Sequence, residues 1–161
     1  MKKIILMGML LLLGSVPSFA QQEDIERYYR EQRESLRGLD GLSLFISVPR
    51  EFDRLYQEER AVRARLEKGG VKLNTEGPAT LLVSVYAKYD ARLKVYAVFL
   101  SLEVRQPATI NRTGKSEQAM TWIRRMQMIC DARCKPLDET LTTMLDSFIS
   151  DFQLANPRRK T

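Results

Sequence analysis

The sequence predicts an α+β fold, a two-layer sandwich in which one mixed, mostly antiparallel sheet of about five strands carries two helices on one face. Three observations predict it. Several segments alternate apolar and polar residues with the period of two that is typical of strands. Two longer segments repeat apolar residues at helical spacing, and turns rich in glycine and proline separate the elements. A further amphipathic helix is expected at the N-terminus.

The strands are expected at residues 42–48, 71–75, 80–89, 93–105 and 117–128. In the first, apolar residues occupy every second position and Pro49 ends the strand, because proline cannot donate to a neighbouring strand. The strand at 93–105 is apolar on both faces in its first half, which indicates a central position in the sheet. The apolar positions expected on the core side are Leu42, Leu44, Ile46, Val48, Leu81, Val83, Val85, Tyr96, Val98, Leu100, Leu102 and Val104.

Three helices are expected. Residues 21–36 carry a thin apolar stripe, and residues 50–68 carry a broader one that ends at Gly69 and Gly70. The last helix begins near Pro136, a residue favoured in the first helical turn. Its apolar stripe has the strongest helical period in the chain and consists of Leu137, Leu141, Met144, Leu145, Phe148 and Phe152.

The first twenty residues have the pattern of a secretory signal peptide. Two lysines precede an apolar run at residues 4–13, and Ser18 and Ala20 are small residues at the −3 and −1 positions of a cleavage site. The run is too short to span a bilayer, so no transmembrane segment is expected after cleavage. No cysteine follows the run to accept a lipid anchor. The mature chain is therefore expected to begin at Gln21 and to be periplasmic or secreted.

Composition limits the classes of function. Removing 20 leader residues from 161 leaves 141, the length of one domain. Without the two leader lysines, the 26 basic and 20 acidic residues become 24 and 20, a charge of about +4. This weak excess does not predict a nucleic-acid partner. The expected organisation is a leader at 1–20, an N-terminal helix at 21–38, an α+β domain at 39–157 and a disordered basic tail at 158–161.

The two cysteines, Cys130 and Cys134, are expected to form a disulfide bond. An even, closely spaced pair in an exported chain is more typical of a disulfide than of free thiols. The chain contains no histidine, and two thiolates alone do not complete a tetrahedral metal site. The sequence therefore predicts neither a bound metal nor a cofactor.

No catalytic residues are predicted. Without histidine, the usual general base at neutral pH is missing, and Ser-His-Asp and Cys-His arrangements are impossible. Asp138 and Glu139 open the last helix, where acids favour the helix dipole. Asp146 and Asp151 are expected on the helix face opposite the apolar stripe. We therefore expect the protein not to be an enzyme.

Two groups of residues are candidate binding sites. Phe45, Tyr86 and Tyr89 are expected to project from the sheet face opposite the core, where an exposed aromatic surface would mark a contact site. The second group is expected to share one face of the last strand and either lines a groove for an apolar ligand or fills the core between sheet and helices. It consists of Met120, Trp122, Met126 and Met128.

The order of elements from Leu42 onward resembles small bacterial envelope domains, including those of lipopolysaccharide-assembly and curli-secretion lipoproteins. Residues 39–48, the helix end at 66–71, and the segment from Phe148 to Pro157 resemble a widespread class of secreted bacterial proteins. The resemblance implies an envelope location and assigns no functional residue.

The first hypothesis for function is a non-enzymatic accessory domain that binds another envelope protein through the edge or the open face of its sheet. The second is a carrier of a lipid or another apolar ligand, held between the sheet and the helices. The third is a hydrolase that works without histidine.

Overall fold

The computed structural model describes residues 19–52, 59–74, 77–131 and 133–157. The chain divides into two compact units, Met1–Glu31 and Gln32–Thr161. The first unit holds most of helix α1 (Phe19–Glu34), in which the rings of Tyr28 and Tyr29 lie 5.7 Å apart. Ala20, the expected last leader residue, lies in the first turn of this helix. Residues 1–18 of the expected leader and the expected tail at 158–161 fall outside the described residues.

The second unit is built on one four-stranded sheet. Its strands are β1 (Ser43–Ser47), β2 (Thr80–Asp90), β3 (Val95–Thr109) and β4 (Ser116–Cys130), and they lie side by side in that order. β1 runs parallel to β2, and the other two pairs are antiparallel. The mixed, mostly antiparallel sheet and the α+β class are confirmed, with four strands instead of the expected five.

The strand expected at residues 71–75 is reduced to one isolated bridge between Leu42 and Leu73. The preceding helix ends in a Schellman motif, in which the Val71 N–H donates to the Leu66 carbonyl and Gly70 takes a positive φ of 85°. Among the described residues 71–74, the Leu42 N–H then donates to Lys72 and the Asn74 N–H donates to Leu42. This part of the expected strand therefore pairs through a single bridge, and residue 75 lies outside the described residues.

The hairpin of β3 and β4 is longer than expected. The turn-rich loop predicted after residue 105 instead continues β3 to Thr109, through Pro107, and β4 already begins at Ser116. β2 begins at Thr80, opposite Arg105, so β3 has no partner on that side beyond this point. Pro107 is tolerated here because the side of β3 that faces β2 elsewhere has no partner strand at this position.

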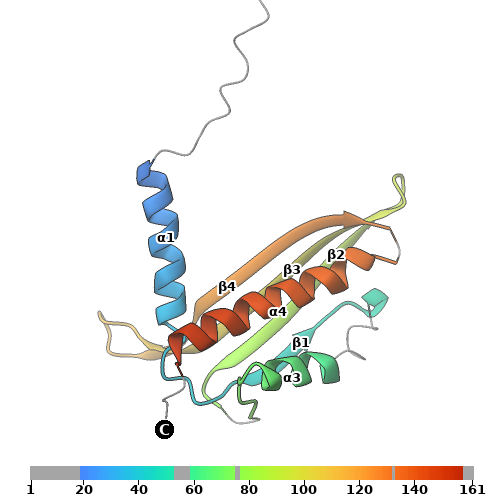
Figure 1. Ribbon diagram of the computed structural model, residues 1–161. Coiled ribbons are helices and arrows are strands. Elements are labelled where there is room, and N and C mark those ends of the chain that lie inside the picture. The colour runs from blue at the N-terminus through green and yellow to red at the C-terminus, as the bar shows by residue number, and fades with distance from the viewer. Residues whose placement is uncertain (1–18, 53–58, 75–76, 132, 158–161) are drawn as a thin grey trace, which may run out of the picture. The chain divides into compact units, whose positions relative to one another are not determined.

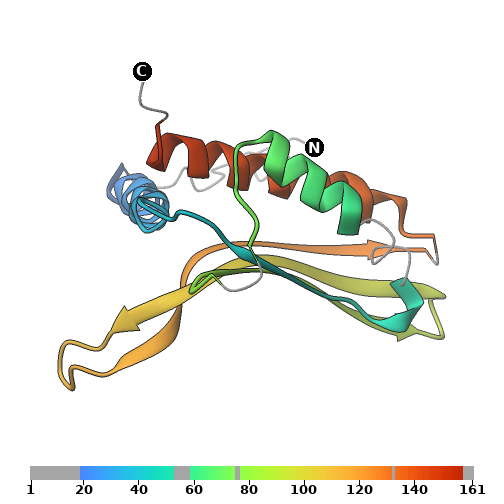
Figure 2. The ribbon, with the colours of Figure 1, turned by 90° about the horizontal axis from the view of Figure 1, so that it is seen from below.

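Helices α3 (Glu59–Lys68) and α4 (Lys135–Ala155) cover one side of the sheet (Figures 1 and 2). Of the helix expected over residues 50–68, the described residues form a short 3-10 turn at Arg50–Phe52 and helix α3 from Glu59, and residues 53–58 lie outside the described residues. The six stripe residues of the last helix are all buried, as predicted. The end of α3 lies so close to α4 that a Cβ added at Gly69 would be 2.5 Å from the Ile149 side chain.

The core lies between the sheet and these two helices. The predicted inward residues of β2 and β3 are buried there except Tyr96, which is partly buried, and Trp122 packs edge-to-face against Phe148 with ring centroids 5.0 Å apart. No helix of the described residues between 32 and 157 lies on the other side of the sheet (Figure 2). The unit is thus a two-layer sandwich with one bare sheet face, which is called the outer face below.

Cys130 and Cys134 form the predicted disulfide, with sulfur atoms 2.00 Å apart and Cα atoms 5.0 Å apart. The bond closes the connection between β4 and α4. Both cysteines are buried, so the crosslink belongs to the core of the unit.

Removing this bond is expected to lower the free energy of unfolding by about 2 kcal/mol, because the bond restricts the conformations of the unfolded chain. The effect is modest because the bond closes a short loop. The melting temperature of the oxidised protein, compared with that of the Cys130→Ser, Cys134→Ser variant, measures the effect. Equal melting temperatures, with thiol titration showing that the parent protein is oxidised, would contradict the prediction.

Candidate functional site

The outer face of the sheet is the candidate site. Strand pairing and the period of two place one set of side chains from all four strands on it. The set consists of Phe45 of β1, Leu82, Ser84, Tyr86 and Lys88 of β2, Ala97, Phe99, Ser101, Glu103 and Arg105 of β3, and Met120, Ile123, Arg125, Gln127 and Ile129 of β4.

Large apolar side chains are exposed on this face. Phe45 is 59% exposed, Tyr86 is 62% exposed and Ile129 is 76% exposed. Tyr86 lies across from Phe99, with ring centroids 6.3 Å apart. The outer face therefore presents an apolar and aromatic surface of the kind that marks contact sites.

Of the three predicted surface residues, Phe45 and Tyr86 lie on the outer face and Tyr89 does not. Phe45 is opposite Leu82, four residues before Tyr86 in β2. Tyr86 and Tyr89 are three residues apart in one strand, so their side chains point to opposite faces. Tyr89 is paired with Tyr96 on the helix side, where the ring centroids are 4.9 Å apart. It is half exposed because it lies at the end of the sheet.

The middle of the outer face is polar. Ser84 and Ser101 are paired and almost fully buried. Beside them, the Glu103 carboxylate is only 8% exposed and lies between two guanidinium groups, 3.0 Å from Arg105 and 3.6 Å from Arg125. The Glu103 carboxylate thus forms ion pairs with both arginines within the sheet surface.

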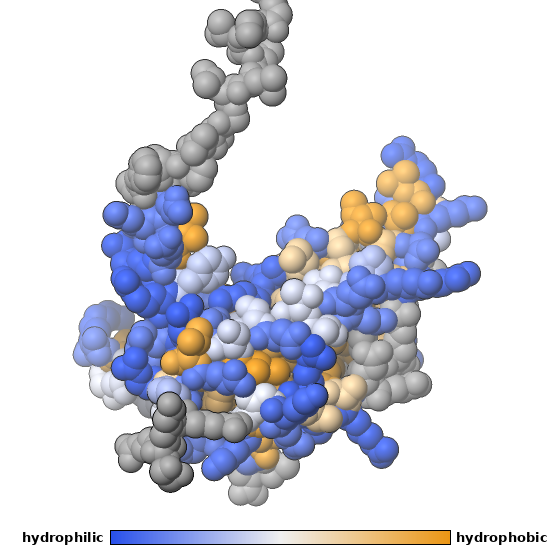
Figure 3. Space-filling view, in the orientation of Figure 1, coloured by the Kyte–Doolittle hydropathy of each residue, from blue (hydrophilic) through white to orange (hydrophobic). Residues whose placement is uncertain are grey.

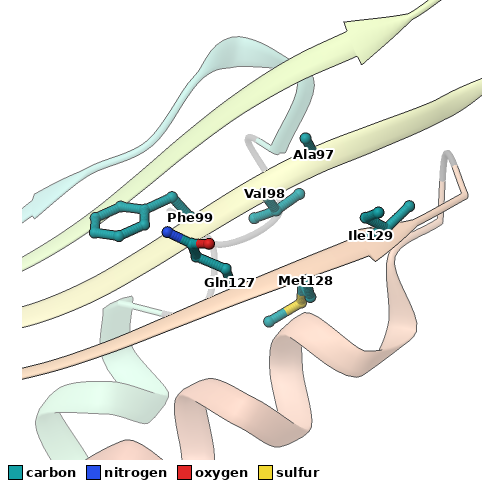
Figure 4. A pocket seen from close by; sticks show the side chains of 6 residues that line it. All are labelled: Ala97, Val98, Phe99, Gln127, Met128 and Ile129. Carbon is teal, nitrogen blue, oxygen red and sulfur yellow. The ribbon is translucent and has the colours of Figure 1, made fainter.

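An open hollow of about 630 Å³ lies along β3 and β4. Three neighbouring pairs line it, Ala97 with Ile129, Val98 with Met128, and Phe99 with Gln127. In Figure 4, Phe99 and Gln127 lie close together between the strands, and Met128 points toward α4. The small Ala97 side chain between larger neighbours leaves the space open. The expected last strand ends at Met128, so the sequence prediction did not include Ile129.

The four residues predicted to share a face of the last strand do not all do so. Trp122 pairs with Val104, but Met120 pairs with Arg105, so Thr121 is an extra residue in β4. Such a bulge shifts the alternation by one residue and turns Met120 to the outer face. Met126 and Met128 stay on the helix side with Trp122. The bulge has no signal in the alternation of the sequence.

Trp122 is fully buried in the core. Its Nε1–H donates to Asp151 at 3.0 Å, and the Arg124 guanidinium lies 4.7 Å from the centroid of its ring. Met126, by contrast, is 47% exposed. The positions considered for a ligand groove are therefore divided between core and surface.

The prediction that Asp151 lies on the helix face opposite the apolar stripe is wrong. Asp151 is only 7% exposed and accepts hydrogen bonds from Trp122, from Arg124 at 2.7 Å and from Arg33 at 3.2 Å. Position 151 lies three residues after Phe148, at the margin of the apolar stripe, where donors from β4 reach it. Gln32 completes the cluster by accepting from Arg124 at 2.8 Å.

The other acid of α4, Asp146, pairs with Arg65 of α3 on the surface. Two hydrogen bonds of 2.7 and 2.6 Å join the side chains. The hydrogen bonds from Arg65 lower the pKa of Asp146 below its usual value, and the Asp146 carboxylate raises the pKa of Arg65. The pair connects α3 to α4 at the surface and is structural in character.

The described residues contain no group of three or more His, Cys, Asp and Glu side chains that could hold a metal ion. Among the same residues, no helix is long and apolar enough to cross a membrane.

Neither a protein-family model nor a curated protein matches the chain. Two solved structures align with most of it. A PelC variant dodecamer from Paraburkholderia phytofirmans is 17% identical, with 74% of this chain and 86% of that chain covered and a TM-score of 0.37. A minor lipoprotein from Acinetobacter baumannii is 16% identical, with 73% and 87% covered and a TM-score of 0.25.

Proposed function

We propose that the protein is a non-enzymatic, exported accessory domain that binds another protein of the cell envelope through the outer face of its sheet. The exposed aromatic side chains of Phe45 and Tyr86 carry the proposal. They lie on a face that no helix of the described residues between 32 and 157 covers (Figure 2). The signal-peptide pattern expected at residues 1–20 supports a partner in the envelope.

The shape of the surface favours a protein partner. The outer face spans four strands and ends at β4, an edge strand that pairs with β3 in the described sheet. On the other side of β4, Gln32 accepts from the Ile123 N–H and Ser35 donates to the Thr121 carbonyl, so the edge is already bonded at these two positions. A strand edge offers backbone groups to an added strand, and neighbouring apolar side chains supply specificity. We therefore expect a partner to engage the apolar surface of the outer face and the edge of β4 away from Thr121 and Ile123.

The arrangement of the buried acids supports a non-enzymatic role. Asp151 and Glu103 are each held by two guanidinium groups, and no histidine is present to accept a proton at neutral pH. Both acids therefore neutralise cations within the fold.

A photo-crosslinking amino acid at position 86 tests the proposal in cells that express the full chain. The expected result is a crosslink to one envelope protein. The same probe at position 142, exposed on α4, serves as the matched control and is expected to give none. The Phe45→Ser substitution should weaken the crosslink at least several-fold without unfolding the domain, since Phe45 is exposed. Equal crosslinking from positions 86 and 142 would contradict the proposal.

A second candidate function is that of a carrier of a lipid or another apolar ligand. The open hollow beside Phe99 and Ile129 favours it, because its lining is mainly apolar. This hollow lies along β3 and β4 rather than in the core around Trp122. Native mass spectrometry of freshly purified protein distinguishes the two functions, since a carrier retains a ligand mass and an accessory domain does not.

A further inference from the structure

One end of the sheet gathers the turn between β2 and β3 and the disulfide loop. Tyr89 pairs with Tyr96, and Tyr96 pairs with Cys130, so the three residues form one row across the strands. The turn at residues 91–94 projects beyond this row (Figure 1). The name "basic tip" is used below for Lys88, Tyr89, Arg92, Leu93, Lys94 and Ile129.

The apolar side chains of the basic tip are among the most exposed in the protein. Ile129 is 76% exposed and Leu93 is 60% exposed. Asp90 holds the turn in place, because one of its carboxylate oxygens accepts from the backbone N–H groups of Arg92 and Leu93 at 2.9 Å. Figure 3 shows apolar side chains between hydrophilic ones at this end of the sheet. Leu93 is thus presented to solvent by an ordered turn.

The cations of the basic tip surround these apolar residues. Lys88, Arg92 and Lys94 are exposed and form no ion pair with another described residue. Asp90 is the acidic residue next to these cations in the chain, and its carboxylate accepts the hydrogen bonds that hold the turn. The neighbouring disulfide loop adds Arg133 and Asp131, whose charges cancel. The tip therefore carries positive charge around exposed leucine and isoleucine.

We propose that the basic tip binds the surface of an anionic lipid bilayer. Leu93 and Ile129 would enter the boundary between head groups and acyl chains, and the three cations would lie among the lipid phosphates. Tyrosine is enriched at this depth in membrane proteins, and Tyr89 would lie there. A projecting turn favours a lipid surface over an acidic protein, because insertion needs no matching recess. The inference shares with the proposed function the exported location and two residues of the outer face, Lys88 and Ile129. Phe45 and Tyr86 carry the proposed function, and the turn at residues 91–94 carries this inference.

Sedimentation of the mature chain, from Gln21 onward, with lipid vesicles tests the proposal. Binding is expected to vesicles that contain phosphatidylglycerol and to be weak with phosphatidylcholine alone. Replacing Lys88, Arg92 and Lys94 by glutamine should lower the partition coefficient on the order of 100-fold, since each cation near the surface contributes about fivefold. Replacing Leu93 and Ile129 by serine should lower it about tenfold or more.

The turn between β3 and β4 provides a matched control. It also carries an exposed isoleucine and two cations, so Ile110→Ser with Arg112→Gln and Lys115→Gln makes the same kind of change at another turn. This variant should keep at least half of the binding. Equal losses from both turns, or equal binding to neutral vesicles, would overturn the proposal. Binding of a polyglutamate peptide, with no binding to anionic vesicles, would assign the tip to an acidic protein.

Two further measurements keep these outcomes distinct. Thermal unfolding of each variant shows whether a loss of binding comes from a loss of structure. The crosslink from position 86 reports on the outer face separately, so either proposal can fail while the other holds.

Discussion

Replacing Asp151 by alanine is expected to lower the free energy of unfolding by about 3–5 kcal/mol, because it leaves buried cationic and polar donors without an acceptor. The Asp151 side chain is only 10% exposed and binds Arg124, whose side chain is 20% exposed, as well as Arg33 and the Trp122 indole. Urea denaturation at neutral pH measures the loss.

Asp146→Ala is the matched control, since both acids lie on α4 and each binds arginine. The Asp146 side chain is 54% exposed and its partner Arg65 is 42% exposed, so water replaces the lost interaction. The expected change is a small fraction of that for Asp151. Similar losses in the free energy of unfolding from the two substitutions would show that burial does not determine how much Asp151 contributes to stability.

Replacing Trp122 by alanine is expected to destabilise the protein by about 3–5 kcal/mol as well, since it empties a large volume of the core. The ring is fully buried against Phe148 and hydrogen-bonded to Asp151. Met126→Ala, at a half-exposed position on the same face, should cost much less. Chemical denaturation of both variants gives the comparison.

The Trp122 substitution also tests the ligand-groove hypothesis. A Trp122→Ala protein that keeps its stability and loses a co-purified apolar ligand would show that the residue binds a ligand. The effects of Trp122→Ala and Asp151→Ala should not add in the double variant, because the two side chains share a hydrogen bond.

Much of the fold could be predicted because it follows from local patterns. The stripe of α4 and the inward residues of β2 and β3 were correctly assigned, since burial on one face leaves a period in the sequence. The disulfide followed from the close spacing of Cys130 and Cys134. The missing fifth strand was not predictable, because residues 71–75 have strand-like composition, whereas the single bridge between Leu42 and Leu73 depends on tertiary contacts.

The candidate site was predictable only in part. Phe45 and Tyr86 were correctly placed on one face by alternation from the core. Tyr89 was misplaced although the period of two could have excluded it. Met120 was misplaced because the bulge at Thr121 depends on the pairing with β3. Glu103 and Arg125 were missed because cross-strand neighbours are known only once the register is set.

The sequence by itself determined the class of fold, the expected export and the residues that form the core, because these depend on composition and on periods within single elements. Only the tertiary structure decided that Asp151 is buried beneath two arginines, that Ile129 borders an open hollow, and that no helix of the described residues between 32 and 157 covers one sheet face. Those features depend on contacts between residues far apart in the chain, and such contacts leave no periodic signal in one sequence.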